Sequence, residues 1–284
     1  MIFAITGSTG MIGLALTKYL ISLKQEVIMF VRKDCKKYDK IPKSDLITII
    51  KCDLNELGNL SVDYKCDYFI HMAWDKTIGV GRNDVYLQNM NIKYTLDAIN
   101  LAKKMNAIKF VGIGSQAEYG PHQEALSINT SCDPITGYGI AKYCAGKFGK
   151  ILAEQLKIEY NWIRVLSVYG ENDNPNTLIS YVTDCFKKNI SPEVTKCEQI
   201  WDYIECNDAA KIIYKIALNG ENGVTYPLGS GKGKPLKNYL EELKNKMNSN
   251  VEIKYGAKDY PIGQVMHLVA DMSYLKSFDN VKED

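Results

Sequence analysis

The sequence predicts an α/β fold, in which a smaller C-terminal lobe is interleaved with a doubly wound parallel sheet. Three observations support this prediction. Apolar, β-branched segments alternate with helix-spaced segments through the first 170 residues. The first apolar segment, residues 2–6, runs directly into a glycine-rich loop and then into a helix-spaced run. After Gly170 the alternation stops, and the pattern of elements changes.

The expected elements of the first part follow in a regular order. Strands are predicted at residues 2–6, 26–31, 46–51, 67–71, 108–114 and 161–166. Helices are predicted near 11–23, 83–105 and 138–158. Apolar runs that alternate with helices in this way are typical of a parallel sheet covered by helices on both faces.

The second part reads as a smaller lobe made from separate pieces of the chain. Its expected pieces are a loop at 171–176, a helix at 177–188, a strand-to-helix segment at 200–214, a strand at 224–228, a helix at 236–247 and a polar tail at 278–284. We therefore assign residues 1–166, with about 199–216, to the large domain. Residues 167–198 and 217–284 form the smaller lobe in this assignment.

The composition argues against several classes of protein. The chain has 284 residues, 46% of them hydrophobic and 24% charged, and 35 basic residues nearly balance 33 acidic ones. The charges are interspersed, so no nucleic-acid partner is expected, and no apolar run reaches the length of a membrane span. The eight cysteines form no CxxC pair and only three histidines are present, so we expect no metal site. With the first strand starting at Met1, we expect a cytoplasmic protein with reduced thiols.

The glycine-rich loop predicts a dinucleotide site in a Rossmann fold. Gly7 allows a sharp turn off the strand, Gly10 leaves room for backbone amides to approach a pyrophosphate, and Gly13 lets the helix pack closely on the sheet. The positive N-terminal end of the helix then faces the phosphates. The loop residues expected at the cofactor are Gly7, Thr9, Gly10, Met11, Ile12 and Gly13.

A second set of residues suggests proton transfer beside that cofactor. Tyr138 and Lys142 lie one helical turn apart, and Ser115 ends an apolar strand. Ligands bind at the C-terminal ends of strands in this kind of sheet, so the three side chains could converge there. We expect Lys142 to lower the pKa of Tyr138 from its usual value of about 10 toward neutrality, so that the phenol can act as an acid. Ser115 would hold the carbonyl oxygen.

The chain resembles the extended short-chain dehydrogenases/reductases that act on nucleotide-activated sugars, over nearly its whole length. The matching motifs are GSTGMIG (7–13), CDL (52–54), HMAW (71–74), Asn91, GSQAEYG (114–120), YGIAK (138–142), RVLSVYG (164–170), WDYIECND (201–208) and YPLGS (226–230). HMAW, GSQAEYG and WDYI most resemble the reductases of CDP- or dTDP-4-keto-deoxysugars, such as CDP-abequose and CDP-paratose synthases.

The resemblance implies roles for particular residues. Ser115, Tyr138 and Lys142 would be catalytic. The cofactor would contact Asp53 and Leu54 at its adenine, Met72, Ala73 and Trp74 along its length, and Lys76 and Asn91 near the nicotinamide ribose. The substrate would contact Gln116, Ala117, Glu118, Ser167 and Trp201.

The end of the second strand bears on the choice of cofactor. NAD-binding folds usually place a carboxylate there for the ribose 2′-hydroxyl. This sequence has Arg32 and Lys33 instead, and cations suit a 2′-phosphate. NADP(H) is therefore favoured, while Asp34, one residue further on, keeps NAD(H) open.

The sequence leaves the reaction open. A 4,6-dehydratase of this family carries an Asp-Glu pair directly after the catalytic hydroxyl, where this chain has Gln116-Ala117. That reaction is disfavoured. We favour NADPH-dependent reduction of a 4-keto-(6-deoxy)sugar, with hydride transfer to C4 and Tyr138 as the proton donor, for surface polysaccharide biosynthesis. The alternatives are an NAD-retaining 4-epimerase and a non-catalytic NADP-binding sensor.

Two departures from the family pattern concern the substrate. Trp201 stands where many relatives have an arginine for the diphosphate, and Ser167 stands where an asparagine is frequent. The nucleotide sugar must then be gripped by another cation or sit differently. The resemblance also implies a homodimer formed through the helices near 83–105 and 141–157.

Overall fold

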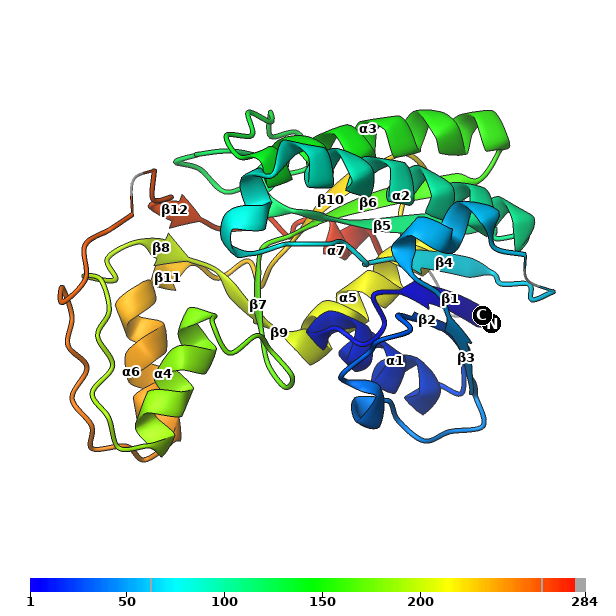
Figure 1. Cartoon of the computed structure of the whole chain (residues 1–284). Coiled ribbons are helices and arrows are strands. Elements are labelled where there is room, and N and C mark those ends of the chain that lie inside the picture. The colour runs from blue at the N-terminus through cyan, green and yellow to red at the C-terminus, as the bar shows by residue number, and fades with distance from the viewer. Residues whose placement is uncertain (62, 262, 279–284) are drawn as a thin grey trace.

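The computed structural model describes residues 1–61, 63–261 and 263–278. Its larger part is built on a seven-stranded sheet in the order β10-β6-β5-β4-β1-β2-β3 (Figure 1). Every neighbouring pair in this sheet is parallel. The strands are β1 (Ile2–Thr6), β2 (Glu26–Val31), β3 (Ile47–Lys51), β4 (Tyr68–His71), β5 (Lys109–Ser115), β6 (Glu159–Val165) and β10 (Thr225–Leu228).

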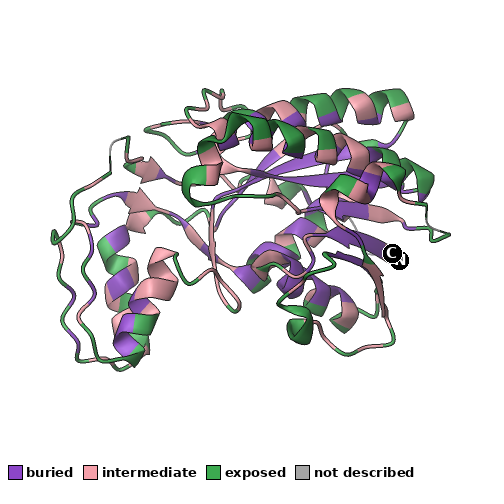
Figure 2. Ribbon diagram, in the orientation of Figure 1, coloured by how far each residue is buried: buried purple, intermediate pink, exposed green. Residues whose placement is uncertain are grey.

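Helices cover both faces of the sheet, as the continuous apolar strands predicted. On one face, α1 (Met11–Ser22) packs beside α5 (Cys206–Asn219), and on the other α2 (Val85–Lys104) packs beside α3 (Gly137–Leu156). Successive strand residues point to opposite faces. Phe3 and Ile5 therefore join the core under α1 and α5, whereas Ala4 joins the core under α2 and α3. Figure 2 shows the strands buried between these helical layers.

The strand order reverses between β1 and β4, and this reversal opens a crevice at the carboxyl ends of the strands. The glycine-rich loop follows β1 and Ser115 ends β5, so both lie at the same edge of the sheet. Short 3₁₀ helices fill that edge: η1 (Tyr38–Lys40), η2 (Leu54–Asn59), η3 (Gly79–Asn83) and η4 (Gln116–Glu118). The topology thus brings the predicted cofactor and catalytic segments together.

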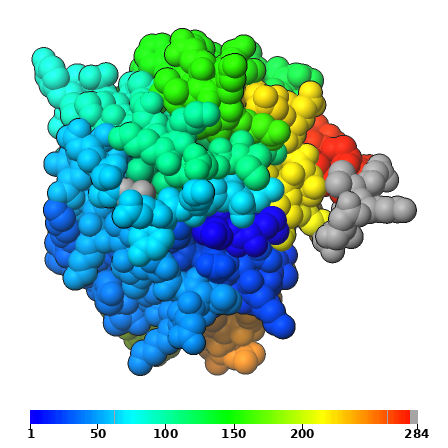
Figure 3. Space-filling view, turned by 90° about the vertical axis from the view of Figure 1, so that its right-hand side faces the viewer, coloured from blue at the N-terminus to red at the C-terminus, as the bar shows by residue number. Residues whose placement is uncertain are grey.

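The smaller lobe lies at the left of Figure 1, beyond the ends of the strands. Its elements are β7 (Ser167–Tyr169), α4 (Leu178–Lys187), β8 (Ile200–Trp201), β9 (Tyr203–Glu205), β11 (Lys234–Pro235), α6 (Leu236–Lys246) and β12 (His267–Leu268). Helices α4 and α6 bury Val182, Phe186 and Leu240 in a separate small core. Seen from the right-hand side of Figure 1 (Figure 3), the N-terminal half and the helices α2 and α3 hide most of this lobe.

The predicted strands and helices of the first 170 residues are confirmed, with ends that shift by at most two residues. Two assignments to the smaller lobe were wrong. The strand β10 pairs with β6 and completes the large sheet, because edge strand β6 otherwise has no partner on that side. Phe278 was expected to begin a polar tail, but it lies in α7 (Leu275–Phe278) and packs on Tyr226 and Tyr274 in the large core. Residues 279–284 lie outside the described residues.

None of the described helices combines the length and apolar character that a bilayer crossing requires. Within the same described ranges, no group of three or more His, Cys, Asp or Glu side chains is placed to hold a metal ion.

Candidate active site

A cleft of about 930 Å³ lies at the carboxyl edge of the sheet. It runs from the glycine-rich loop past the ends of β2 and β3 to the segment after β4. The predicted cofactor residues that line it are Gly7, Thr9, Gly10, Arg32, Asp53, Leu54, Met72, Ala73, Trp74 and Lys76. Most of the proposed cofactor set therefore borders one continuous space.

The glycine-rich loop has no room for side chains at two of its glycines. Gly7 has φ +69°, and a Cβ there would lie 2.7 Å from the Ala73 backbone nitrogen. A Cβ on Gly13 would lie 2.4 Å from the Gly7 carbonyl oxygen. Met11 and Ile12 turn their side chains into the core, so only their backbone can face the cleft.

The N-terminus of α1 fits an anionic ligand. Gly10 occupies the N-cap position, no side chain caps the helix, and its first turn contains no acidic residue. The first backbone N–H groups and the positive end of the helix dipole therefore remain available for a phosphate. The residues present at this end of the cleft fit the pyrophosphate of a dinucleotide.

Where the cleft passes the end of β2, the two predicted cations make different contacts. The Arg32 side chain borders the cleft, with its Nε 3.9 Å from an Asp34 carboxylate oxygen. The Lys33 ammonium instead forms an ion pair with Glu56 on η2, which raises the pKa of Lys33 and lowers that of Glu56. Asp53 accepts a hydrogen bond of 3.2 Å from the Lys33 backbone nitrogen. Arg32 is thus the predicted cation that remains available to a ligand.

Two further cations at this end were not predicted. Lys36 and Lys37 both line the cleft beside Arg32. Their signal was the basic run that starts at Lys33, which is typical of a solvated surface. Only the folding of the loop after β2 toward the cleft distinguishes them from ordinary surface lysines.

The segment after β4 forms the wall of the cleft. Trp74 lines it and donates a hydrogen bond of 2.8 Å from Nε1 to Gln88 Oε1 on α2. Asn91 is buried behind this wall, where it accepts from the Asp75 backbone nitrogen at 2.9 Å and donates to the Asp75 carbonyl at 3.1 Å. Asn91 was expected near the ribose, and the structure instead places it as a support for the segment that lines the cleft.

The catalytic set predicted from the sequence lies where this wall meets α3. Thr136 caps α3 by accepting from the Gly139 backbone nitrogen at 3.0 Å, which fixes the first turn that carries Tyr138. The Tyr138 ring meets the Trp74 ring edge-on, with centroids 6.0 Å apart. Ser115, at the end of β5, lies close enough to the Tyr138 phenol to act on its pKa as a hydrogen-bond partner. Tyr138 is therefore next to both the cleft wall and Ser115.

The Lys142 ammonium contacts a backbone carbonyl and an aromatic ring. Its Nζ donates to the Ile113 carbonyl at 2.5 Å and lies 3.9 Å from the Trp74 ring centroid. Burial lowers the pKa of Lys142 to about 7, although the Glu118 carboxylate acts in the opposite direction. A buried ammonium loses hydration, and the carbonyl and the ring replace only part of it.

The expected acidification of Tyr138 by Lys142 is not what this structure shows. Burial raises the pKa of Tyr138, because a phenolate would lose its hydration there. The Ser115 hydrogen bond and the charge of Arg82 oppose this effect. Arg82 was not among the predicted site residues, since an isolated arginine in a Gly-rich loop carries no distinctive sequence signal.

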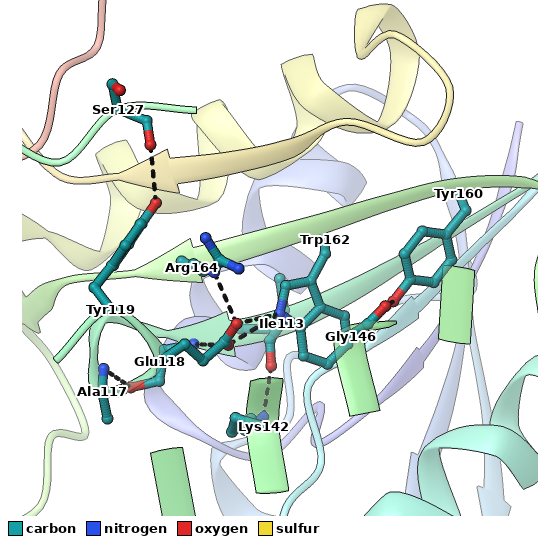
Figure 4. A network of polar contacts seen from close by, with 11 residues as sticks. Ile113, Ala117, Glu118, Tyr119, Ser127, Lys142, Gly146, Tyr160, Trp162 and Arg164 are labelled. Carbon is teal, nitrogen blue, oxygen red and sulfur yellow. Dashed lines mark hydrogen bonds and ion pairs between the residues drawn. The ribbon is translucent and has the colours of Figure 1, made fainter. Parts of the chain in front are cut away.

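Glu118 was predicted to contact the substrate, but its carboxylate is completely buried (Figure 4). It accepts from Arg164 Nε at 2.8 Å, from Trp162 Nε1 at 2.9 Å and from the Ser115 backbone nitrogen at 2.8 Å. Every donor comes from the protein itself. Glu118 consequently fixes the backbone of Ser115 and leaves no surface for a substrate.

The remaining predicted substrate residues fall into two places. Gln116 and Ala117 are half-buried in η4, next to Ser115. Ser167 and Trp201, the two departures from the family pattern, contact each other: Trp201 Nε1 donates to Ser167 Oγ at 2.8 Å. The indole therefore has its hydrogen-bonding group engaged by the residue that replaces the frequent asparagine.

His71 ends β4, which lies in the sheet between β1, before the glycine-rich loop, and β5, which ends at Ser115. It is buried, its Nδ1 is 2.8 Å from the Thr6 hydroxyl, and burial lowers its pKa to about 3. His71 is therefore neutral and ties β4 to β1 at the strand ends.

Comparison with known proteins agrees with this arrangement. Residues 3–229 match the sequence profile of the NAD dependent epimerase/dehydratase family. A putative UDP-glucose 4-epimerase of Methanocaldococcus jannaschii is 27% identical over 284 residues, which covers 96% of this chain and 90% of that protein. The CDP-abequose synthase of Salmonella typhimurium is 25% identical over 286 residues, with the same two coverages.

Solved structures share the fold at lower identity. The UDP-N-acetylglucosamine 4-epimerase of Methanobrevibacter ruminantium, solved in complex with UDP-N-acetylmuramic acid, has a TM-score of 0.88 at 23% identity and covers 99% of this chain and 92% of its own. The UDP-glucose 4-epimerase of Thermus thermophilus, solved with NAD, has a TM-score of 0.86 at 16% identity, with coverages of 100% and 94%. With its doubly wound sheet, its glycine-rich loop and a profile match over most of its length, the chain belongs to the NAD dependent epimerase/dehydratase family.

Proposed function

We propose that this protein is an NADPH-dependent reductase of a nucleotide-activated 4-keto-(6-deoxy)sugar, for surface polysaccharide biosynthesis. The observation that carries the proposal is the meeting of Ser115 and Tyr138 next to Trp74, which lines the nucleotide cleft. A proton donor and a hydroxyl that can hold a carbonyl oxygen then lie behind the Trp74 wall of a dinucleotide-sized cleft. The sequence similarity to a CDP-abequose synthase supports the same class of substrate.

In this proposal each residue has a defined role. The bound cofactor would supply hydride to the carbonyl carbon of the sugar. Ser115 donates a hydrogen bond to the carbonyl oxygen, and Tyr138 gives its proton to that oxygen as it becomes an alkoxide. Lys142, held by the Ile113 carbonyl and Trp74, keeps the first turns of α3 in register with β5. Glu118 fixes the Ser115 backbone.

The preference for NADPH rests on charge at the adenosine end of the cleft. Arg32, Lys36 and Lys37 line it, and cations form charge-assisted hydrogen bonds with a 2′-phosphate. Two carboxylates, Asp34 and Asp53, also line this end. They support the alternative of a ribose 2′-hydroxyl, and thus of NAD.

The second candidate function is an NAD-retaining nucleotide-sugar 4-epimerase. The similarity to a putative UDP-glucose 4-epimerase and the two carboxylates favour it. An epimerase oxidises and then reduces the same carbon, so the same Tyr138 would first accept and then return a proton. A non-catalytic sensor is disfavoured, because Ser115, Tyr138 and Lys142 are all present.

We also propose that the protein forms a homodimer through α2 and α3. Exposed apolar side chains gather on these two adjacent helices: Val85, Met90, Ile140, Phe148 and Ile151. Three of them are spaced along α3 so that they share one face. Sedimentation of the wild type and of Phe148→Glu would test the dimer, which the charged variant should dissociate.

The function is tested with stereospecifically deuterated NADPH. Incubation with CDP- and dTDP-4-keto-6-deoxysugars should place deuterium at C4 of the product. Tyr138→Phe should reduce turnover about 10³-fold or more, since general acid catalysis contributes about 10²–10⁴-fold. Tyr64→Phe, which removes a half-exposed phenol outside the site, should have no effect. Interconversion of C4 epimers by protein that carries bound NAD, without added reductant, would overturn the reductase proposal in favour of the epimerase.

A further inference from the structure

The guanidinium of Arg82 lies over the face of the Tyr138 ring, with its Cζ 4.4 Å from the ring centroid. We propose that Arg82 is a positioning residue for the reaction, whose fixed charge stabilises the phenolate that Tyr138 becomes when it gives up its proton. This inference rests on the proposed function, in which Tyr138 is the proton donor.

The segment that carries Arg82 is fixed against α3. Arg82 Nη1 donates to the Thr77 carbonyl at 2.9 Å, and the adjacent Asn83 side chain accepts from the Gly137 backbone nitrogen at 2.9 Å. A Cβ on Gly137 would lie 3.1 Å from the Arg82 carbonyl oxygen. The glycine before Tyr138 thus allows η3 to approach the first turn of α3 closely.

The same segment is tied to the cleft wall by one buried side chain. Gln88 Nε2 donates to the Gly81 carbonyl at 2.8 Å and to the Lys76 carbonyl at 3.1 Å, while its Oε1 accepts from Trp74. Gln88 is 1% exposed. The position of Arg82 on the phenol is therefore set by the residues that shape the nucleotide cleft, rather than by a free surface loop.

The charged and titratable groups around Tyr138 come from three elements. Arg82 approaches from η3, Lys142 lies one turn along α3, and Glu118 lies in η4 with Ser115 before it. Glu118 raises the pKa of Tyr138, and Arg82 and the Ser115 hydrogen bond lower it. Arg82 is thus a cation in direct contact with the phenol ring.

Arg82 and Lys142 also differ in how their charge depends on pH. Burial lowers the pKa of Lys142 to about 7, so part of it is neutral at neutral pH. A guanidinium stays protonated throughout the physiological range. Arg82 therefore provides a constant positive charge on the ring, whereas the charge of Lys142 changes over the pH range in which the reaction would run.

The positive charge of Arg82 matters because proton transfer leaves a negative charge on Tyr138. The Tyr138 O–H bond breaks, its proton forms a new O–H bond on the C4 oxygen of the sugar, and the electron pair stays on the phenolate. Bound NADPH would supply the hydride that reduces the carbonyl carbon in the same reaction. The attraction between a cation and an aromatic face increases when the ring carries a negative charge. Arg82 thus favours the state that follows proton donation.

The experiment follows the reverse reaction, oxidation of the product alcohol with NADP⁺, in which ionised Tyr138 acts as the base. Its kcat/KM should rise with pH through the pKa of the Tyr138 phenol. In Arg82→Met this rise should move upward by about one pH unit, which lowers the rate below the pKa about tenfold. Arg82→Lys keeps a positive charge at this position, so its pH profile should lie close to that of the wild type. Thermal melting checks that each variant is folded.

Lys93→Met is the matched control, because it removes an exposed cation of α2 that pairs with Asp97 and does not approach Tyr138. Its pH profile should equal that of the wild type. A folded Arg82→Met with an unmoved profile would overturn the inference, and so would an equal shift in Lys93→Met. If Tyr138→Phe keeps normal turnover, the proposed function itself fails, which is a different result from an inert Arg82.

Discussion

Two regions of the proposed site use charge in opposite ways. At the β2 end of the cleft, the side chains of Arg32 and Asp34 are 67% and 81% exposed. Behind Ser115, in the proposed catalytic region, those of Arg164 and Glu118 are 7% and 0% exposed. Water screens the first pair, so its charges contribute little to stability and remain free to meet a ligand. The second pair interacts in a medium of low dielectric constant, where removal of one partner is costly. In the proposed function, exposed charges therefore serve ligand recognition, and buried charges fix the geometry around Ser115.

The largest effect is expected for Glu118→Gln at the buried end. The amide keeps the shape but leaves the buried Arg164 guanidinium without its counter-charge. The free energy of unfolding should fall by about 3–5 kcal/mol, measured by urea denaturation. Glu124→Gln, on the exposed surface of the following loop, should change it by less than about 0.5 kcal/mol. Equal losses in the two variants would show that burial does not distinguish these carboxylates.

Substitution of two glycines at the nucleotide end should affect protein stability and ligand binding to different degrees. Gly13→Ala would push a methyl group against the Gly7 carbonyl at 2.4 Å, and should destabilise the protein by about 3 kcal/mol, the upper end of the range for overpacking. Gly10→Ala meets only the Gly7 carbonyl, at 3.3 Å, and should cost much less stability. It should still weaken cofactor binding, because its methyl group enters the space in front of the α1 N-terminus. Calorimetric titration with NADPH and urea denaturation of both variants test this division.

A pH dependence of stability is expected from His71, which is buried at the end of the central strand β4. Burial lowers its pKa from the usual 6.5 to about 3. Between these two values, the imidazole therefore binds a proton in the unfolded chain but not in the folded chain. Stability from this group is complete above pH 6.5 and falls as the pH drops toward 3. Between pH 7 and pH 5 the loss should be about 2 kcal/mol.

Comparison with His71→Asn isolates this contribution, because asparagine does not titrate. Between pH 7 and pH 5, the free energy of unfolding of the wild type should fall by more than that of the variant. Parallel curves over that interval would contradict a buried neutral imidazole.

The smallest effect is expected from the exposed cations. Arg32→Ala should lower the preference for NADPH over NADH by about tenfold, the value of one charge-assisted hydrogen bond of about 1.4 kcal/mol. Lys33→Ala should leave that preference unchanged, since Glu56 engages its ammonium and it does not line the cleft. Steady-state kinetics with both cofactors give the ratio. A larger change in Lys33→Ala than in Arg32→Ala would reverse the assignment.

Much of the fold could be predicted from the sequence, because its signals are local. The apolar run of residues 2–6 and the glycines after it predict a strand, a turn and a helix from residues that are neighbours in the sequence. Tyr138 and Lys142 share a helix face for the same reason. The membership of β10 in the large sheet was missed, since strand pairing depends on which edge is free, and that is a property of the assembled sheet.

The electrostatic character of the site was decided only by the tertiary structure. A sequence shows that Glu118, Arg164, Lys142 and Arg82 are present, but it does not show how deeply each is buried or which charges face one another. Glu118 was expected to contact the substrate, but in the folded protein it is buried and pairs with Arg164. The buried Lys142 donates to a backbone carbonyl. The fold also places Arg82, from a distant loop, on the phenol. The backbone conformation of this chain follows from short-range preferences, whereas the energy of a charge depends on the dielectric environment that only the packed molecule creates.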